Sequence, residues 1–252
     1  NLIPLRLPDL NYDQNLLGQL DIMGFTLFAI VGLSSVGCIG WAIFRRNSIV
    51  VRAAQPFFLI MVATGVLIMG SAIIPLSYDD DGEPESFSSF KGKAICMSVP
   101  WLAFVGFTIT FSALFSKTWR VNRIFRAANG HTRIKVTERD VLAPFVILLI
   151  GNIVVLSCWT ALDPLTYERI ERDGTDYWNR VLESYGSCNS DHAVRYLVPL
   201  GLLNFAVVAT ASWQALEARE LKSEFSEAKF IGHAVISVLQ AFLTGIPVVV
   251  VV

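Results

Sequence analysis

Residues 22–44 have the sequence IMGFTLFAIVGLSSVGCIGWAIF, which contains no charged side chain. An α-helix needs about 20 apolar residues to cross the hydrocarbon core of a bilayer, and buried helices of soluble proteins are usually shorter. Runs of the same kind recur at residues 53–78, 94–116, 141–162, 196–216 and 230–252. Backbone groups in lipid must be paired within their own segment, so each of the six runs is expected to be a helix. The sequence therefore predicts an all-α polytopic membrane protein.

Basic residues are distributed unevenly between the loops that connect these runs. Most of the 20 Lys and Arg residues lie in the first, third and fifth loops, whereas the second loop is acidic. An excess of Lys and Arg marks the cytoplasmic loops of membrane proteins. We therefore expect a multi-pass protein of the cell membrane, with its N-terminus outside the cell and its basic loops in the cytoplasm.

The two ends of the chain indicate that it belongs to a longer protein. The chain starts at Asn1 without a signal segment, and it stops on a run of valines at the end of the sixth apolar run. We expect a targeting sequence ahead of residue 1 and further chain after residue 252. Residues 1–21 are polar with scattered apolar positions, so they are expected to be an extracellular linker that leads into a transmembrane bundle at 22–252.

The 4 cysteines fall into two groups by location. Cys38 and Cys158 lie inside apolar runs, where a free thiol behaves as a small apolar side chain. Cys96 lies at the outer end of the third run, and Cys188 lies in the outer loop before the fifth run. Both would face an oxidising compartment, so a disulfide between them is the natural interpretation, and two unpaired thiols are the alternative.

A basic stripe follows the third run. Lys117, Arg120, Arg123 and Arg126 recur at intervals of three, so they share one face if the helix continues into the cytoplasm. The stripe could dock a cytoplasmic partner, or it could anchor the helix to anionic lipid headgroups, and periodicity alone favours the anchor. The other candidates for cytoplasmic contact are Arg45, Arg46 and Lys229.

Lys117 also has a candidate partner of opposite charge. Glu227 lies just before the sixth run, at the same expected depth as Lys117. An ion pair in such a half-wet setting is worth about 1 kcal/mol or less, which suits a switch better than a permanent link. The sequence by itself does not show that the two side chains meet.

Polar residues inside the runs are few, and none of them is Asp, Glu, Lys or Arg in mid-membrane. This composition argues against an ion pump or a proton relay, which need ionisable groups in the membrane. Asn152, Asn204 and Gln240 are expected to form hydrogen bonds between helices. The alternative is a solute path along them, as in a small transporter or channel subunit. No metal, phosphate-loop or nucleophile motif is present, so neither an enzyme, nor a cofactor, nor a nucleic-acid partner is expected.

Four stretches of the chain resemble the class C G-protein-coupled receptors, most closely the metabotropic GABA type B branch. VRAAQP at 51–56 is similar to the family's start of span two, and FSKTWRV at 115–121 to its third-span exit. SCWTALDPL at 157–165 is similar to the close of span four, and EAKFIG at 227–232 to the start of span six. The four matches occur in the family's order over nearly the whole chain.

The resemblance implies a seven-helix bundle, of which six spans are in this chain and the seventh is missing. It implies activation of a heterotrimeric G protein after a ligand binds an extracellular domain, and a homo- or heterodimer with a related subunit. The Cys96 and Cys188 positions match the family's disulfide. Lys117 and Glu227 match the residues that can hold its resting state. A receptor partner that does not itself couple to a G protein is the alternative within the family.

Overall fold

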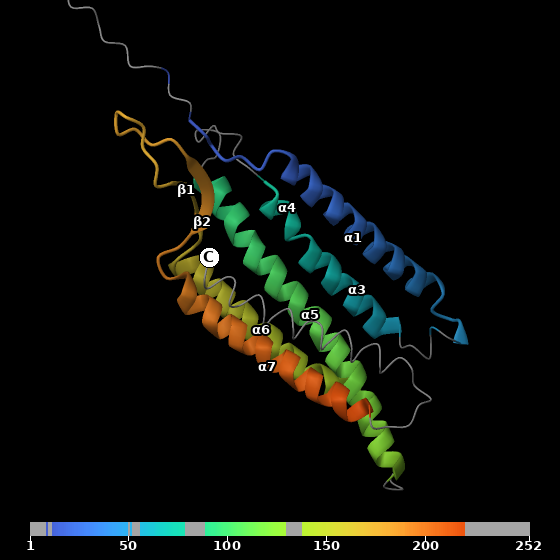
Figure 1. Cartoon of the computed structure of the whole chain (residues 1–252). Coiled ribbons are helices and arrows are strands. Elements are labelled where there is room, and N and C mark those ends of the chain that lie inside the picture. The colour runs from blue at the N-terminus through green and yellow to red at the C-terminus, as the bar shows by residue number, and fades with distance from the viewer. Residues whose placement is uncertain are drawn as a thin grey trace, which may run out of the picture.

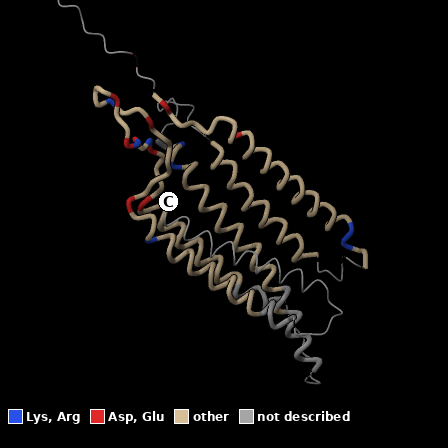
Figure 2. The backbone as a smooth tube through the Cα atoms, in the orientation of Figure 1, with Lys and Arg blue, Asp and Glu red and all other residues tan. Residues whose placement is uncertain are grey.

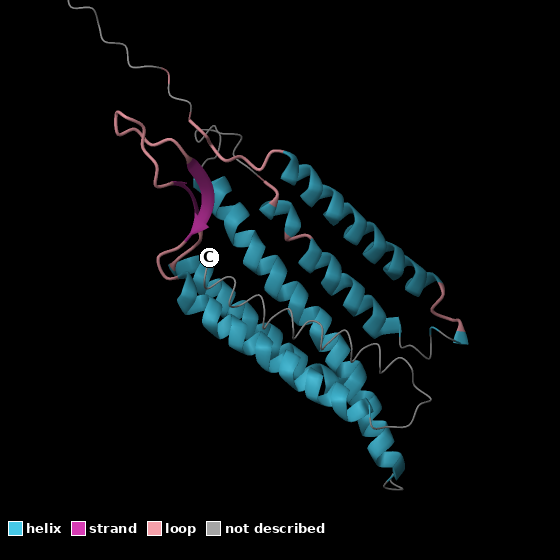
Figure 3. Cartoon of the chain, viewed as in Figure 1, coloured by secondary structure: helices cyan, strands magenta, loops and turns pink. Residues whose placement is uncertain are grey.

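The computed structural model describes residues 9, 12–49, 51, 56–78, 89–129 and 138–219. Its helices run side by side, and a two-stranded hairpin lies at one end of them (Figures 1 and 3). We call this end the hairpin end and the opposite end the far end. The elements in chain order are α1 (Gln19–Phe44), α3 (Pro56–Gly70), α4 (Ile73–Leu76), α5 (Ser89–Asn129), α6 (Glu138–Leu162), β1 (Thr166–Glu171), β2 (Ser184–Asn189) and α7 (Ala193–Arg219).

The described residues contain five helical segments that are long and apolar enough to cross a membrane. They are α1, α3 together with α4, and the apolar parts of α5, α6 and α7, and they correspond to the first five predicted runs. The sixth run, 230–252, lies outside the described residues. Charged residues lie mostly at the hairpin end and at the far end of α1, and the described helical stretches between carry none (Figure 2). This arrangement is that of an all-α membrane bundle.

Helix α5 is the centre of the bundle. In its spanning segment 44% of the most apolar stretch is buried, whereas the corresponding share in the other four segments is only 11% to 17%. It packs against α3, α6 and α7, and α1 packs on the outside of α3. The remaining apolar surface of the outer helices is exposed and suits contact with lipid, as in Leu33 and Ile147. Any movement of α5 therefore reaches three other helices directly.

The second predicted run, 53–78, forms two helices rather than one. Helix α3 ends at Gly70, and α4 begins at Ile73 after a turn. Pro75 explains the break, because proline has no N–H to donate to the carbonyl of Ser71, and its ring would clash with that carbonyl. The Ser71 carbonyl accepts instead from the Ile74 N–H at 3.1 Å, and the Ser71 hydroxyl donates to the Ile68 carbonyl oxygen at 2.6 Å.

Two glycines let the backbones of α3 and α5 touch. A Cβ atom added to Gly106 would lie 2.5 Å from the Met69 nitrogen and 2.8 Å from the Gly65 oxygen. A Cβ atom added to Gly65 would lie 2.9 Å from the Gly106 oxygen. Small residues at such crossings allow close packing of helices in membranes, where water supplies no hydrophobic drive.

Helix α5 continues beyond the apolar run to Asn129 and projects past the other helices at the far end (Figure 1). This extension meets the condition under which Lys117 and the three arginines after it share one helix. Their side chains lie outside the described part of the chain, so which face they occupy stays a prediction.

Candidate functional site

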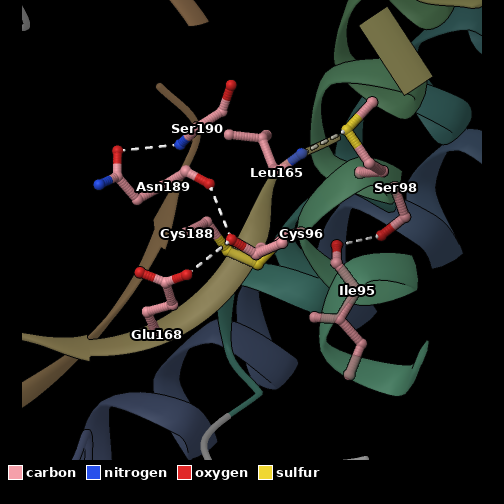
Figure 4. The surroundings of a disulfide bond; sticks show 10 residues. Ile95, Cys96, Ser98, Leu165, Glu168, Cys188, Asn189 and Ser190 are labelled. Carbon is pink, nitrogen blue, oxygen red and sulfur yellow. Dashed lines mark hydrogen bonds between the residues drawn. A yellow bond between two sulfur atoms is a disulfide. The ribbon is translucent and has the colours of Figure 1, made fainter. Parts of the chain in front are cut away.

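The 165–192 loop forms an ordered hairpin on the end of the bundle. Strand β1 pairs with β2 in antiparallel register, with Tyr167 opposite Cys188 and Ile170 opposite Tyr185. Cys188 is joined by a disulfide to Cys96 in the second turn of α5, with their Cα atoms 5.7 Å apart (Figure 4). This is the pairing expected from the sequence. The hairpin is therefore fastened covalently to the central helix.

Both ends of this loop are also held by hydrogen bonds. Asp163, at the end of α6, accepts through Oδ2 from the Ser190 hydroxyl at 2.8 Å and from the His192 backbone N–H at 3.0 Å. At the other end, the Leu165 N–H points to the Met97 sulfur at 3.3 Å (Figure 4). These contacts join the ends of α5, α6 and α7 through the base of the hairpin.

The segment before α1 adds to the edge of the hairpin. Asp13 pairs with Glu183 in parallel, donating its N–H to the Leu182 oxygen at 2.8 Å and accepting from the Ser184 N–H at 3.0 Å. The Arg169 guanidinium reinforces this joint, because Nη1 donates to the Gln14 carbonyl at 3.1 Å. Part of the expected linker at 1–21 is thus bound to the hairpin, and through it to α5.

The tip of the hairpin is braced around one carboxylate. Asp176 accepts at Oδ1 from the backbone N–H groups of Trp178 and Arg180, both at 2.9 Å, and its Oδ2 lies 2.7 Å from two guanidinium nitrogens of Arg180. Loss of water acts to raise the pKa of the Asp176 carboxyl. The hydrogen bonds from Arg180 and Trp178, with the charge of Arg180, outweigh that effect and lower this pKa below 3.8.

A buried polar node joins three helices deeper in the bundle. Asn204 of α7 donates through Nδ2 to the Asn152 Oδ1 of α6 at 2.9 Å, and the Thr108 hydroxyl of α5 lies 3.4 Å from the Asn204 Oδ1. All three residues have 0% exposure. The prediction that Asn152 and Asn204 form bonds between helices is confirmed, whereas Gln240 lies outside the described residues. Sequence reasoning did not single out Thr108.

An aromatic layer lies between the node and the hairpin. The Trp159 and Tyr196 rings stack with centroids 5.8 Å apart, and Trp159 packs in one buried cluster with Met97, Leu156 and Leu200. Met97 follows the disulfide residue Cys96, and the Leu200 carbonyl accepts from the Asn204 Nδ2 at 2.7 Å. Contiguous packing therefore extends from the disulfide to the polar node.

The far end carries the residues predicted to contact a cytoplasmic partner. Arg45 and Arg46 are exposed immediately after α1. Lys117, Arg120, Arg123 and Arg126 lie on the α5 extension, with undescribed side chains. Glu227 and Lys229 lie outside the described residues, so the Lys117–Glu227 ion pair stays a prediction. In the described part of the chain, no group of three or more His, Cys, Asp or Glu side chains could hold a metal ion.

Five apolar helices around a buried centre, with a disulfide-linked hairpin at one end, define a helical multi-pass membrane protein. A family model described as the 7 transmembrane sweet-taste receptor of 3 GCPR matches residues 18–252. The chain belongs to this family, the class C G-protein-coupled receptors, whose members are receptors rather than enzymes.

Known relatives agree with this assignment. Gamma-aminobutyric acid type B receptor subunit 2 of Rattus norvegicus is 26% identical over 202 residues, which cover 77% of this chain and 21% of that protein. Metabotropic glutamate receptor-like protein E of Dictyostelium discoideum is 31% identical over 147 residues, which cover 56% of this chain and 15% of that protein. Metabotropic glutamate receptor-like protein G of the same organism is 26% identical over 233 residues, which cover 91% of this chain and 28% of that protein. The chain spans about a fifth of the length of the first of these relatives.

Proposed function

We propose that this chain is the transmembrane relay of a class C receptor, which passes ligand binding outside the cell to a heterotrimeric G protein inside it. The observation that carries the proposal is the attachment of the segment before α1 to α5, through the Asp13 pairing, the hairpin and the Cys96–Cys188 disulfide. A movement of that segment is transmitted to the central helix rather than to a free loop.

Helix α5 can carry such a movement across the membrane. It runs without a break through 41 residues, which is about 60 Å at 1.5 Å per residue. Cys96 lies near one end of it and the Lys117–Arg126 stripe near the other. A tilt or rotation imposed at the disulfide can therefore displace the basic end along one continuous helix, in which Pro100 lies between the two.

The orientation in this proposal rests on two observations. The disulfide lies at the hairpin end, and disulfides persist in oxidising compartments such as the cell exterior. Arg45 and Arg46 lie at the far end, as basic residues of cytoplasmic loops do. A glycan acceptor engineered beside Glu83, in the loop between α4 and α5, is expected to be glycosylated in cells. An acceptor that stays unmodified would contradict the proposed orientation.

At the cytoplasmic end, we place the G-protein contact on the basic surface and the switch beside it. The contact residues are Arg45, Arg46, Arg120, Arg123, Arg126 and Lys229, some of which also meet anionic lipid headgroups. The Lys117–Glu227 pair would hold the resting state. A pair worth about 1 kcal/mol changes a two-state equilibrium by about five-fold, which is enough for regulation and weak enough for release.

The test is basal nucleotide exchange on a G protein by the full-length receptor, compared at matched surface level. Glu227→Ala is expected to raise exchange several-fold, and the reversed pair Lys117→Glu with Glu227→Lys is expected to return it toward the wild-type value. If exchange is measurable and neither Lys117→Glu nor Glu227→Ala alters it, the ion-pair hypothesis is wrong and the relay proposal stands. No exchange in any variant, together with indifference to neutralising Arg120, Arg123 and Arg126, would indicate a partner subunit that does not couple.

The proposed relay acts with a second subunit, homologous or identical, because relatives of this chain include type B receptor proteins named as subunits 1 and 2. Cross-linking of the full-length receptor in cells is expected to trap a dimer. A transporter or channel is not favoured, since Asn152 and Asn204 are fully buried and bonded to each other rather than open to a path.

A further inference from the structure

The indole N–H of Trp159, in α6, is buried without an acceptor. The residue is 1% exposed, and its ring packs among Met97, Leu156 and Leu200, which offer apolar side chains. Among the side chains that the structure describes, its Nε1 is the one buried nitrogen or oxygen atom without a hydrogen-bond partner. A buried donor in this state costs at least as much as a lost hydrogen bond, so folded proteins rarely keep one without a reason. An arrangement that brings an acceptor to this N–H would be favoured over the observed one.

A backbone carbonyl that lacks its usual donor belongs to the same layer. In an α-helix each carbonyl accepts from the N–H four residues later. The residue four positions after Cys96 is Pro100, which lies inside α5 and has no N–H to donate. Cys96 is 1% exposed, and the next residue, Met97, belongs to the buried cluster around Trp159. The layer therefore combines a donor without an acceptor and a carbonyl without its helical donor.

Pro100 also separates two parts of α5 that are held by different partners. Trp101, directly after Pro100, donates from Nε1 to the Thr160 Oγ1 at 3.0 Å, so α5 is fixed to α6 at this level. Cys96, before Pro100, is fixed to the hairpin by the disulfide (Figure 4). Sharp bends in helices occur mostly at proline. A displacement of the hairpin is therefore expected to bend α5 at Pro100.

We propose that Trp159 is a conformational switch, whose indole N–H donates to the Cys96 carbonyl when α5 bends at Pro100. In the observed arrangement the donor is unpaired, which raises the free energy of this arrangement relative to the bent one. In the bent arrangement the new bond joins α6 to the part of α5 that carries the disulfide. The switch thus lowers the work that the hairpin must do to bend the helix. Its role in signalling rests on the proposed function, whereas the unpaired donor and the bend do not.

The first test replaces only the N–H group. Benzothienylalanine has the shape of tryptophan with sulfur in place of the N–H, and it is incorporated at a single position of the full-length receptor, whose reversible unfolding in mixed detergent is followed by circular dichroism. At Trp159 it removes an unpaired donor and is expected to reduce the unfolding constant about five-fold. At Trp101, the matched control, it removes the donor of a formed bond and is expected to increase this constant about three-fold. An increase at Trp159 would mean that its N–H is already bonded, and would overturn the switch.

The second test asks whether the Cys96 carbonyl is the acceptor. Pro100→Ala returns a helical donor to this carbonyl and is expected to keep α5 from bending. In the full-length receptor with isotope-labelled tryptophan, the indole resonance of Trp159 is identified by its loss in Trp159→Phe. Its proton shift averages the bonded and unpaired forms, so Pro100→Ala is expected to move it upfield. Pro199→Ala, which removes the proline inside α7, is the control and should leave it in place. A resonance that Pro100→Ala does not move, or that Pro199→Ala moves equally, overturns the Cys96 carbonyl as the acceptor.

Basal nucleotide exchange on a G protein, measured on the same variants at matched surface level, tests the role in signalling separately. Benzothienylalanine at Trp159 and Pro100→Ala are each expected to lower exchange about five-fold. Their combination should lower it no further than either change alone, because both act on one bond, and full additivity would overturn that shared bond. If the wild type gives no exchange while the unfolding and resonance results are as expected, the proposed coupling is wrong and the switch stands.

Discussion

Replacing Asn204 by leucine tests the polar node directly. Leucine has the same branched heavy-atom skeleton as asparagine, with two larger methyl groups in place of the amide oxygen and nitrogen. The change therefore removes the hydrogen bonds, keeps the shape of the side chain and adds a small cost of overpacking. The variant loses the bond from Nδ2 to Asn152 at 2.9 Å and the longer contact with Thr108 at 3.4 Å. The bond from Asn204 Nδ2 to the Leu200 carbonyl is lost as well, but this carbonyl lies inside helix α7 and is not left unpaired by the change.

The expected cost follows from the number of partners left unpaired. One hydrogen bond between membrane helices contributes about 0.6 kcal/mol on average and up to about 1.7 kcal/mol. The Asn152 Oδ1 is also left buried at 0% exposure without its donor, which adds about 1 kcal/mol or more. The change adds little cost at Thr108, because its hydroxyl still donates a hydrogen bond to the Phe104 carbonyl at 2.7 Å. We expect Asn204→Leu to lower the free energy of unfolding by about 2 kcal/mol.

The assay is reversible unfolding of the purified receptor in mixed detergent, followed by tryptophan fluorescence, for wild type, Asn204→Leu, Asn152→Leu and the double variant. A coupling energy of about 1 kcal/mol between the two asparagines is expected. The double variant should cost less than the sum of the single ones, because no buried acceptor is then left without its donor. A coupling energy near zero would refute the reasoning, since it would mean that the node contributes packing alone.

Three further predictions concern other parts of the molecule. Gly106→Ala is expected to destabilise the receptor by about 2 kcal/mol by forcing α3 and α5 apart, whereas Gly37→Ala, whose added methyl group meets nothing within 4 Å, should leave thermal stability unchanged. Asp163→Ala should speed proteolysis within residues 165–192 while the disulfide is intact, because the Ser190 and His192 bonds are lost; unchanged cleavage would contradict this role. The lowered pKa of Asp176 predicts that its carboxylate contributes fully to the stability of the hairpin tip above pH 3.8, and that this contribution is lost as the pH falls below that value. Trp178 emission should therefore be constant from about pH 7 to about pH 5 and change in stronger acid, and Asp176→Asn should abolish this pH dependence.

The first five spans could be predicted because a charge-free run of that length has one stable solution in lipid. The break between α3 and α4 was not predicted, because the run at 53–78 was expected to form one helix. Pro75 lies within the run at 53–78, but proline is tolerated in many membrane helices, so its presence alone does not show whether a helix bends or ends there. Which of the two occurs depends on the hydrogen bonds that the backbone around Ser71 and Ala72 forms, and the apolar pattern of the run does not specify them.

The site was predicted in its parts rather than in its assembly. Residue type indicated that Asn152 and Asn204 would form bonds between helices, and location indicated the Cys96–Cys188 pairing. The Asp13 pairing with Glu183 had no signal in the sequence, because it is made by backbone groups that every residue carries. Thr108 was missed for a related reason, since a threonine in an apolar helix more often bonds its own backbone, as it also does here.

The pairing at Asp13 has a mechanical consequence. Its two backbone hydrogen bonds, to Leu182 and from Ser184, both run from the segment before α1 across to the edge of the hairpin. A force that pulls this chain along its own length loads the two bonds at once, in shear, like a lap joint. A force that lifts it sideways loads one bond after the other and peels it away. The joint is therefore a directional coupling, stiff to lengthwise traction and compliant to lateral swing, and only the lengthwise component of a motion is delivered to the disulfide.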